Sequence, residues 1–171
     1  LVIFPEMMLQ FDVGRKKSIL ALNQAIENEQ LIFLTAQKDL VDNEPSGDQI
    51  YKVGVVAKIK QVLSHSEDGI RIFAQGLYRA KIEEMTAESP FLSAALTPLE
   101  TLPYKTTLRT QALIRHAQNL FEGYLRNTRR IPPDVVLGVI EEKDCGKLAD
   151  YITSNISLDY EQKQIILEEL H

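Results

Sequence analysis

The stretch that decides the fold is residues 50–85, IYKVGVVAKIKQVLSHSEDGIRIFAQGLYRAKIEEM. The first half of this stretch alternates: the apolar residues on one face are Tyr51, Val53, Val55, Ala57, Ile59 and Leu63, and the lysines lie on the other face. After a polar cluster ending in Asp68-Gly69 the alternation resumes with Ile70, Ile72, Ala74, Tyr78, Ala80 and Ile82. A period of two indicates half-buried β-strands, and Asp-Gly is typical of a tight turn. The sequence therefore predicts a long antiparallel hairpin.

Matching apolar side chains across the turn predicts the register of this hairpin. The predicted pairs are Leu63 with Ile70, Ile59 with Ala74, Val55 with Tyr78 and Val53 with Ala80. A slip by one residue would turn every apolar side chain of one strand to the wrong face, so burial of one face favours this register.

Some apolar residues nevertheless fall on the polar face of the hairpin: Val56, Val62, Phe73 and Leu77. Such side chains are either covered by another element or left open to a partner. Both explanations stay open on the sequence alone. The second makes Phe73 and Leu77 candidates for a partner-binding surface.

Length and composition are those of a globular protein. The chain has 171 residues, 44% hydrophobic and 25% charged, which allows one large domain or two small ones. It has no apolar run long enough for a bilayer and no signal segment, so we expect no membrane contact. It starts at Leu1 without an initiator methionine, which favours a segment of a longer protein. The single cysteine, Cys145, suits a reducing compartment such as the cytoplasm.

The residues around the hairpin divide the chain into a β-rich part and a helical part. Strands are predicted over residues 1–4, 7–11, 31–36 and 92–98, with one helix over 15–27. Together with the two strands of the hairpin this makes about six strands, and six strands with an inserted helix favour a small closed or nearly closed barrel. Helices are predicted from Thr106 or Thr107 to 127, over 134–142 and 145–154, and from Asp159 to the C-terminus. We therefore expect an α+β fold with subdomains 1–102 and 103–171.

The sequence contains no pattern of an active site or a metal centre. Its histidines, His65, His116 and His171, are far apart, and Cys145 has no obvious histidine partner. The acidic loop 37–49 does not match the spacing of a calcium loop. We predict no catalytic residue and no metal ligand.

Charge is unevenly distributed along the chain. Residues 104–130 contain six basic residues against Glu122 alone, although the net charge of the chain is −5. Either a basic helix packs beside an acidic one, or the segment contacts nucleic acid.

Several short motifs together resemble the amino-terminal domain of the Lon ATP-dependent protease family. They are Phe4-Pro5, Val13-Gly14-Arg15, Leu31-Ile32-Phe33-Leu34, Tyr51-x-Val53-Gly54, Gly76-x-x-Arg79-Ala80, Leu148-Ala149-Asp150 and Glu161-x-Lys163-Gln164. Their order and spacing cover essentially the whole chain.

The resemblance implies a PUA-like β pseudo-barrel with one inserted helix, followed by an α-helical bundle. It implies a non-catalytic domain that recognises unfolded or damaged protein substrates in protein quality control and supports assembly of a homohexamer. The AAA+ ATPase and the Ser–Lys peptidase of the family lie outside these residues. ATP and Mg²⁺ therefore belong to the full-length family, and this fragment is expected to hold no cofactor.

A receptor for many unfolded clients needs adaptable apolar spots. Phe73, Leu77 and Val56 on the hairpin, and Met8 near the N-terminus, are the candidate substrate-binding residues; core packing is the alternative for Met8. The alternative function is a nucleic-acid-binding PUA-like module that uses the basic helix in 104–130. Phe121 and Tyr124 fall on the apolar stripe of that helix, which weakens this alternative.

Overall fold

The structure is a computed structural model that describes residues 1–39, 42, 44–66, 69–127 and 133–170. The chain divides into two units, Leu1–Leu99 and Glu100–His171. The first is rich in strands and the second is helical, so the predicted α+β fold is confirmed. The division follows Leu99, whereas the sequence favours a boundary after residue 102.

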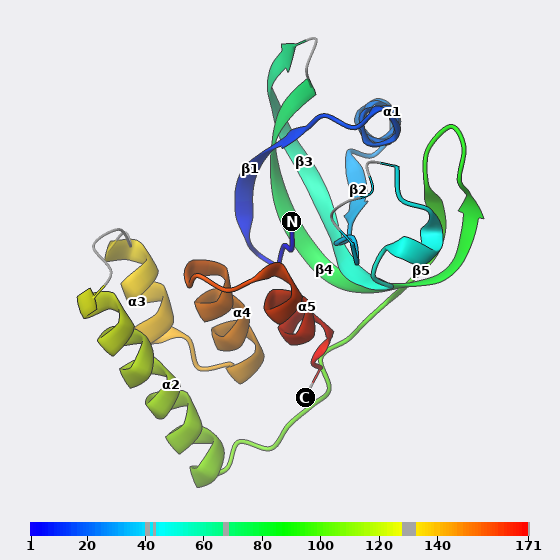
Figure 1. Cartoon of the computed structure of the whole chain (residues 1–171). Coiled ribbons are helices and arrows are strands. Elements are labelled where there is room, and N and C mark those ends of the chain that lie inside the picture. Colours follow the sequence, from blue (N-terminus) through cyan, green and yellow to red (C-terminus); the bar gives the residue numbers. More distant parts are fainter. Residues whose placement is uncertain (40–41, 43, 67–68, 128–132, 171) are drawn as a thin grey trace. The chain divides into compact units, whose positions relative to one another are not determined.

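The predicted hairpin forms the centre of the first unit (Figure 1). Its strands are β3 (Val53–Ser66) and β4 (Gly69–Ala87), both extending closer to the turn than predicted. The pairing of Ile59 with Ala74 is confirmed. Residues 67 and 68 of the predicted turn lie outside the described residues.

The register differs from the prediction on both sides of this pair. Ile70 faces His65 rather than Leu63, and Val55 and Val53 face Arg79 and Lys81. The reason is a set of β-bulges, at which one strand gains a residue that has no partner opposite. The extra residues in the pairing of the two strands are Lys60, Leu63 and Leu77.

The other strands add to the two edges of the hairpin. β1 (Met8–Val13) and β5 (Ser93–Pro98) both pair antiparallel with β4, while β2 (Leu31–Leu34) pairs with β3. The order is β1-β4-β3-β2, with β5 pairing β4 off this path. Figure 1 shows β3 and β4 curving strongly along their length. The sheet is therefore bent into a pseudo-barrel in which β1, β2 and β5 each pair with one described strand.

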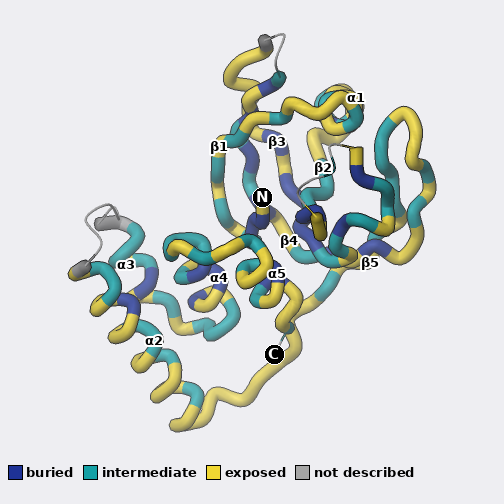
Figure 2. Tube along the Cα trace, in the orientation of Figure 1, coloured by how far each residue is buried: buried dark blue, intermediate teal, exposed yellow. Residues whose placement is uncertain are grey.

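Helix α1 (Lys16–Glu27) covers one side of this sheet because it presents an apolar stripe. Its Leu22 is fully buried. The core around it consists of Ile59, Ile70, Ile72 and Ala74, with Phe11, Val13, Ile19, Ala25, Ile26 and Ile32 packed against it. Figure 2 shows buried residues recurring along the central strands.

The N-terminal segment is buried but is not the strand predicted over residues 1–4. Val2, Ile3 and Phe4 are buried without regular structure. A turn follows, in which the Met7 N–H donates to the Phe4 carbonyl at 3.2 Å and Glu6 has φ 64°. Proline at the second position and a positive φ at the third are typical of a type II turn.

An ion pair joins β1 to β4 where Asp12 faces Arg71. Arg71 Nε lies 2.7 Å from Asp12 Oδ1, and Arg71 Nη2 donates to Oδ2 at 2.9 Å. The hydrogen bond from Arg71, followed by its positive charge, holds the pKa of Asp12 below its ordinary value.

The described part of the second unit contains α2 (Leu108–Asn127), α3 (Pro133–Glu141), α4 (Cys145–Asn155) and α5 (Tyr160–Glu168). The predicted caps are present: the Thr110 N–H donates to Thr107 Oγ1, and the Lys147 N–H to Asp144 Oδ1. Asp159 and Gln162 form the predicted capping box. The core consists of Phe121, Val139 and Leu148 with their apolar neighbours. No helix in the described ranges is long and apolar enough to span a membrane.

Replacing Glu6 by glycine should stabilise the first unit. An L-residue in the left-handed region is strained, and glycine adopts that region freely, so we expect a gain of about 0.5–1 kcal/mol in the free energy of unfolding. Chemical denaturation of wild type and Glu6→Gly measures it. Glu6→Ala is the matched control, because it removes the side chain but keeps Cβ; equal stability of both variants would contradict the account.

The ion pair predicts how one carboxyl titrates. The lowered pKa means that the pair stabilises the folded state above the pKa of an unfolded Asp, and that this contribution disappears as pH falls through the folded pKa. In an NMR titration of the Asp12 carboxyl carbon, Arg71→Gln should raise the pKa of Asp12 towards its ordinary value. An unchanged titration curve in Arg71→Gln would show that Arg71 is not the cause.

Candidate functional site

The side of the sheet opposite α1 carries most of the predicted site residues. Phe11, Ile72 and Ala74 face the core, so their neighbours in each strand face outward. We call these outward residues the outer face: Met8, Gln10 and Asp12 of β1, Arg71, Phe73, Gln75, Leu77 and Tyr78 of β4, Lys58, Lys60 and Gln61 of β3, and Leu31 of β2.

Met8 lies between the two predicted residues of β4. It faces Gln75, which places Phe73 on one diagonal and Leu77 near the other. Diagonal neighbours in an antiparallel sheet are about 7–8 Å apart, within reach of long side chains. Met8 is 59% exposed, Leu77 is 36% exposed and Phe73 is half-buried. The register therefore brings together three predicted residues that are separate in sequence.

Val56 does not belong to this accessible set. It is only 6% exposed, so the interpretation of Val56 as an open apolar spot is wrong. It faces Phe33 on β2 and Tyr78 on β4. Of the two explanations for apolar residues on this face, coverage by another element therefore fits Val56.

Two further apolar residues of the outer face, Tyr78 and Leu31, were not predicted from the sequence. Alternation assigns Tyr78 to the core side, but the bulge at Leu77 shifts the strand and leaves Tyr78 42% exposed. Leu31, the first residue of β2, is also exposed. Leu31, Lys58, Gln75 and Met8 form one row across the four strands. Only the pairing of non-adjacent strands reveals such a row.

The described residues contain no group of three or more His, Cys, Asp or Glu side chains that could hold a metal ion. Cys145 begins α4, where its backbone N–H donates to Tyr104 Oη at 3.2 Å. His65 lies on β3 and His116 on α2, both exposed and in different units.

The basic segment offers poor geometry for stacking nucleic-acid bases. Phe121 is buried and stacks on Tyr124 with ring centroids 6.3 Å apart, within the helical core. Arg126 forms an ion pair with Glu122 of the same helix. Arg129 and Arg130, also part of the predicted basic run, lie outside the described residues. The aromatic platform that single-strand binding requires is therefore not formed by these side chains.

The second unit also exposes apolar side chains. On α2 these are Leu108, Leu113 and Leu120, on α3 Leu137 and Ile140, and on α5 Ile165. Leu113 and Leu120 are seven residues apart and share one face of α2, away from its buried Phe121. Figure 2 shows the exposed residues along α2 and along the segment before it.

Relatives of this chain are proteases many times its length. A protein of Desulforamulus reducens named Lon protease is 35% identical over 170 residues, covering 99% of this chain and 21% of the relative. Lon protease of Syntrophomonas wolfei is 37% identical over 167 residues, covering 98% of this chain and 20% of the relative. The chain thus spans about a fifth of the length of these curated relatives.

Solved structures share the fold. The N-terminal domain of Mycobacterium avium complex Lon protease superposes with a TM-score of 0.69 at 22% identity, covering 99% of this chain and 86% of that one. A Lon N-terminal domain protein from Xanthomonas campestris gives a TM-score of 0.65 at 10% identity, with 99% and 85% coverage. The family model of the ATP-dependent protease La (LON) substrate-binding domain matches residues 1–171. The chain therefore belongs to the LON substrate-binding domain family.

Proposed function

We propose that this chain recognises unfolded or damaged proteins through the outer face of its sheet and delivers them to a Lon-type protease. The observation that carries this proposal is the register that gathers Met8, Phe73 and Leu77 on one side of the sheet. A contiguous patch of exposed apolar side chains, unlike a single exposed one, marks a contact surface on many folded domains.

The chemistry of these side chains fits clients of varied sequence. Methionine is unbranched and polarisable, so Met8 can pack against aliphatic or aromatic partners alike. Phe73 is half-buried, so its ring is held by the sheet and loses little freedom when a client binds. A rigid ring beside flexible side chains favours broad rather than single-sequence recognition.

The full-length protein would add the chemistry that these residues lack. We propose that an ATPase using ATP and Mg²⁺ and a Ser–Lys peptidase lie in other segments of the polypeptide, and that this domain itself is not catalytic. We further propose a cytoplasmic homohexamer. The apolar side chains that α2 and α3 expose, among them Leu113 and Leu137, support a self-association role for the second unit.

Client binding should depend on the outer face and survive high salt. The probe is a fluorescently labelled protein kept unfolded by blocking its cysteines, compared with the same protein in its folded form. Met8→Ser combined with Leu77→Ser should weaken binding of the unfolded form about tenfold or more, because the contact is mainly apolar. Fluorescence anisotropy measures the affinity at low and high salt.

A matched control separates the outer face from general surface apolarity. Leu20→Ser removes a leucine of similar exposure from α1, on the other side of the sheet, and should leave binding unchanged. Thermal unfolding checks that every variant is folded. Equal loss of affinity in Leu20→Ser, or undiminished affinity in the double variant, would overturn the proposal.

A further inference from the structure

We propose that the outer face prefers client segments in which Asp or Glu lies close to the apolar side chains, and that Lys58 and Lys60 provide this preference. The inference rests on the outer face being the client-binding surface, as proposed above.

The outer face is cationic although the chain is acidic. Its charged members are Asp12, Arg71, Lys58 and Lys60. Asp12 and Arg71 neutralise each other through their two-point contact. Among the described residues neither lysine forms an ion pair, which leaves a local balance of +2 on a chain of net charge −5.

The register places both lysines beside the apolar residues. Lys58 faces Gln75 and Leu31, and neither neighbour carries a charge. Lys60 is the extra residue of a bulge, directly before Gln61, which faces Phe73. Both lysines are exposed. Both lysines lie on β3, which pairs with β4, and paired strands are about 4.8 Å apart. The backbone of each lysine is therefore about one strand spacing from the part of β4 that carries Phe73 and Gln75.

These spacings match an extended client. Side chains on one face of an extended chain are about 7 Å apart, so a client residue two positions from one packed on Phe73 comes within reach of a lysine ammonium group. A carboxylate there gains an ion pair, whereas a lysine or arginine is repelled. Exposed ion pairs are weak, so we expect a preference of about 3–10-fold rather than strict selection.

The test uses the 171-residue chain and labelled peptides of equal length in which Phe or Leu occurs at every fourth position and serine at every second position. The positions two residues from each Phe or Leu, which lie on the same face of an extended peptide, are Glu, Gln or Lys in three otherwise identical peptides. At low salt the Glu peptide should bind tightest and the Lys peptide weakest, and high salt should bring the affinities together because salt screens exposed charges.

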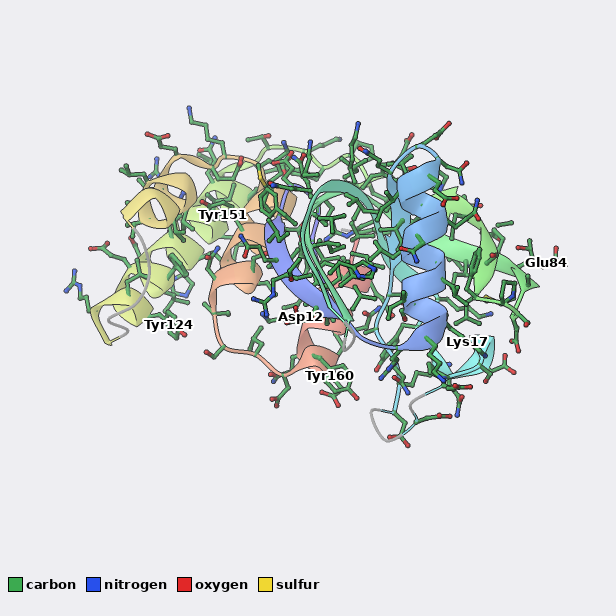
Figure 3. All side chains as sticks on the ribbon, turned by 90° about the horizontal axis from the view of Figure 1, so that it is seen from above. Asp12, Lys17, Glu84, Tyr124, Tyr151 and Tyr160 are labelled. Atoms are coloured by element: carbon green, nitrogen blue, oxygen red, sulfur yellow. The ribbon has the colours of Figure 1, made fainter. Side chains whose placement is uncertain are left out.

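Variants assign the preference to the two lysines. Lys58→Gln with Lys60→Gln should abolish the advantage of the Glu peptide, and Lys58→Glu with Lys60→Glu should reverse the order. Lys16→Gln with Lys17→Gln is the matched control, because it changes the net charge equally on α1, where Figure 3 shows Lys17. The control should keep the wild-type order.

The outcomes distinguish this inference from the proposed function. Equal binding of all three peptides at low salt, or a Glu preference that survives loss of Lys58 and Lys60, would overturn the inference alone. Failure of every peptide and of the unfolded protein to bind would overturn both.

Discussion

The backbone pairing of β4 is the constraint on which the rest of the first unit depends. This one strand pairs with β3 along one edge and with β1 and β5 along the other. Gly76 lies in its middle, where its N–H donates to the Met7 carbonyl. A Cβ there would collide with the Phe4 carbonyl oxygen, so glycine lets the buried N-terminal segment pass close to the strand.

Bulges then decide which side chains the sheet shows to solvent. Because Leu77 is an extra residue, Tyr78 turns outward. Because Lys60 is an extra residue, a cation lies next to Gln61, the residue that faces Phe73. The same devices bend the sheet around α1, because a bulge increases local twist. The curvature that encloses the core and the apolar, cationic character of the outer face thus have one origin.

The alternation of apolar residues in the strands and the residues that cap the helices made much of the fold predictable. The alternation in residues 50–85 predicts the hairpin, and Thr107, Asp144 and Asp159 mark helix starts that the structure contains. The register away from Ile59 and Ala74 was not predictable, because the alternation of apolar residues does not mark which residue of a strand is left without a partner at a bulge. Phe73 and Leu77 could be singled out from one hairpin. Their proximity to Met8 depends on pairing between segments more than sixty residues apart, which sequence periodicity does not encode.

Methyl NMR of the methionines tests the central claim most directly. The chain has three, Met7, Met8 and Met85, and of these Met8 belongs to the outer face. With methyl-labelled methionine, addition of an unfolded protein should shift or broaden the Met8 signal and leave Met85 unchanged, while the folded form of that protein should affect neither. An unchanged Met8 signal under conditions in which the unfolded protein is bound would place the binding surface elsewhere and contradict the account.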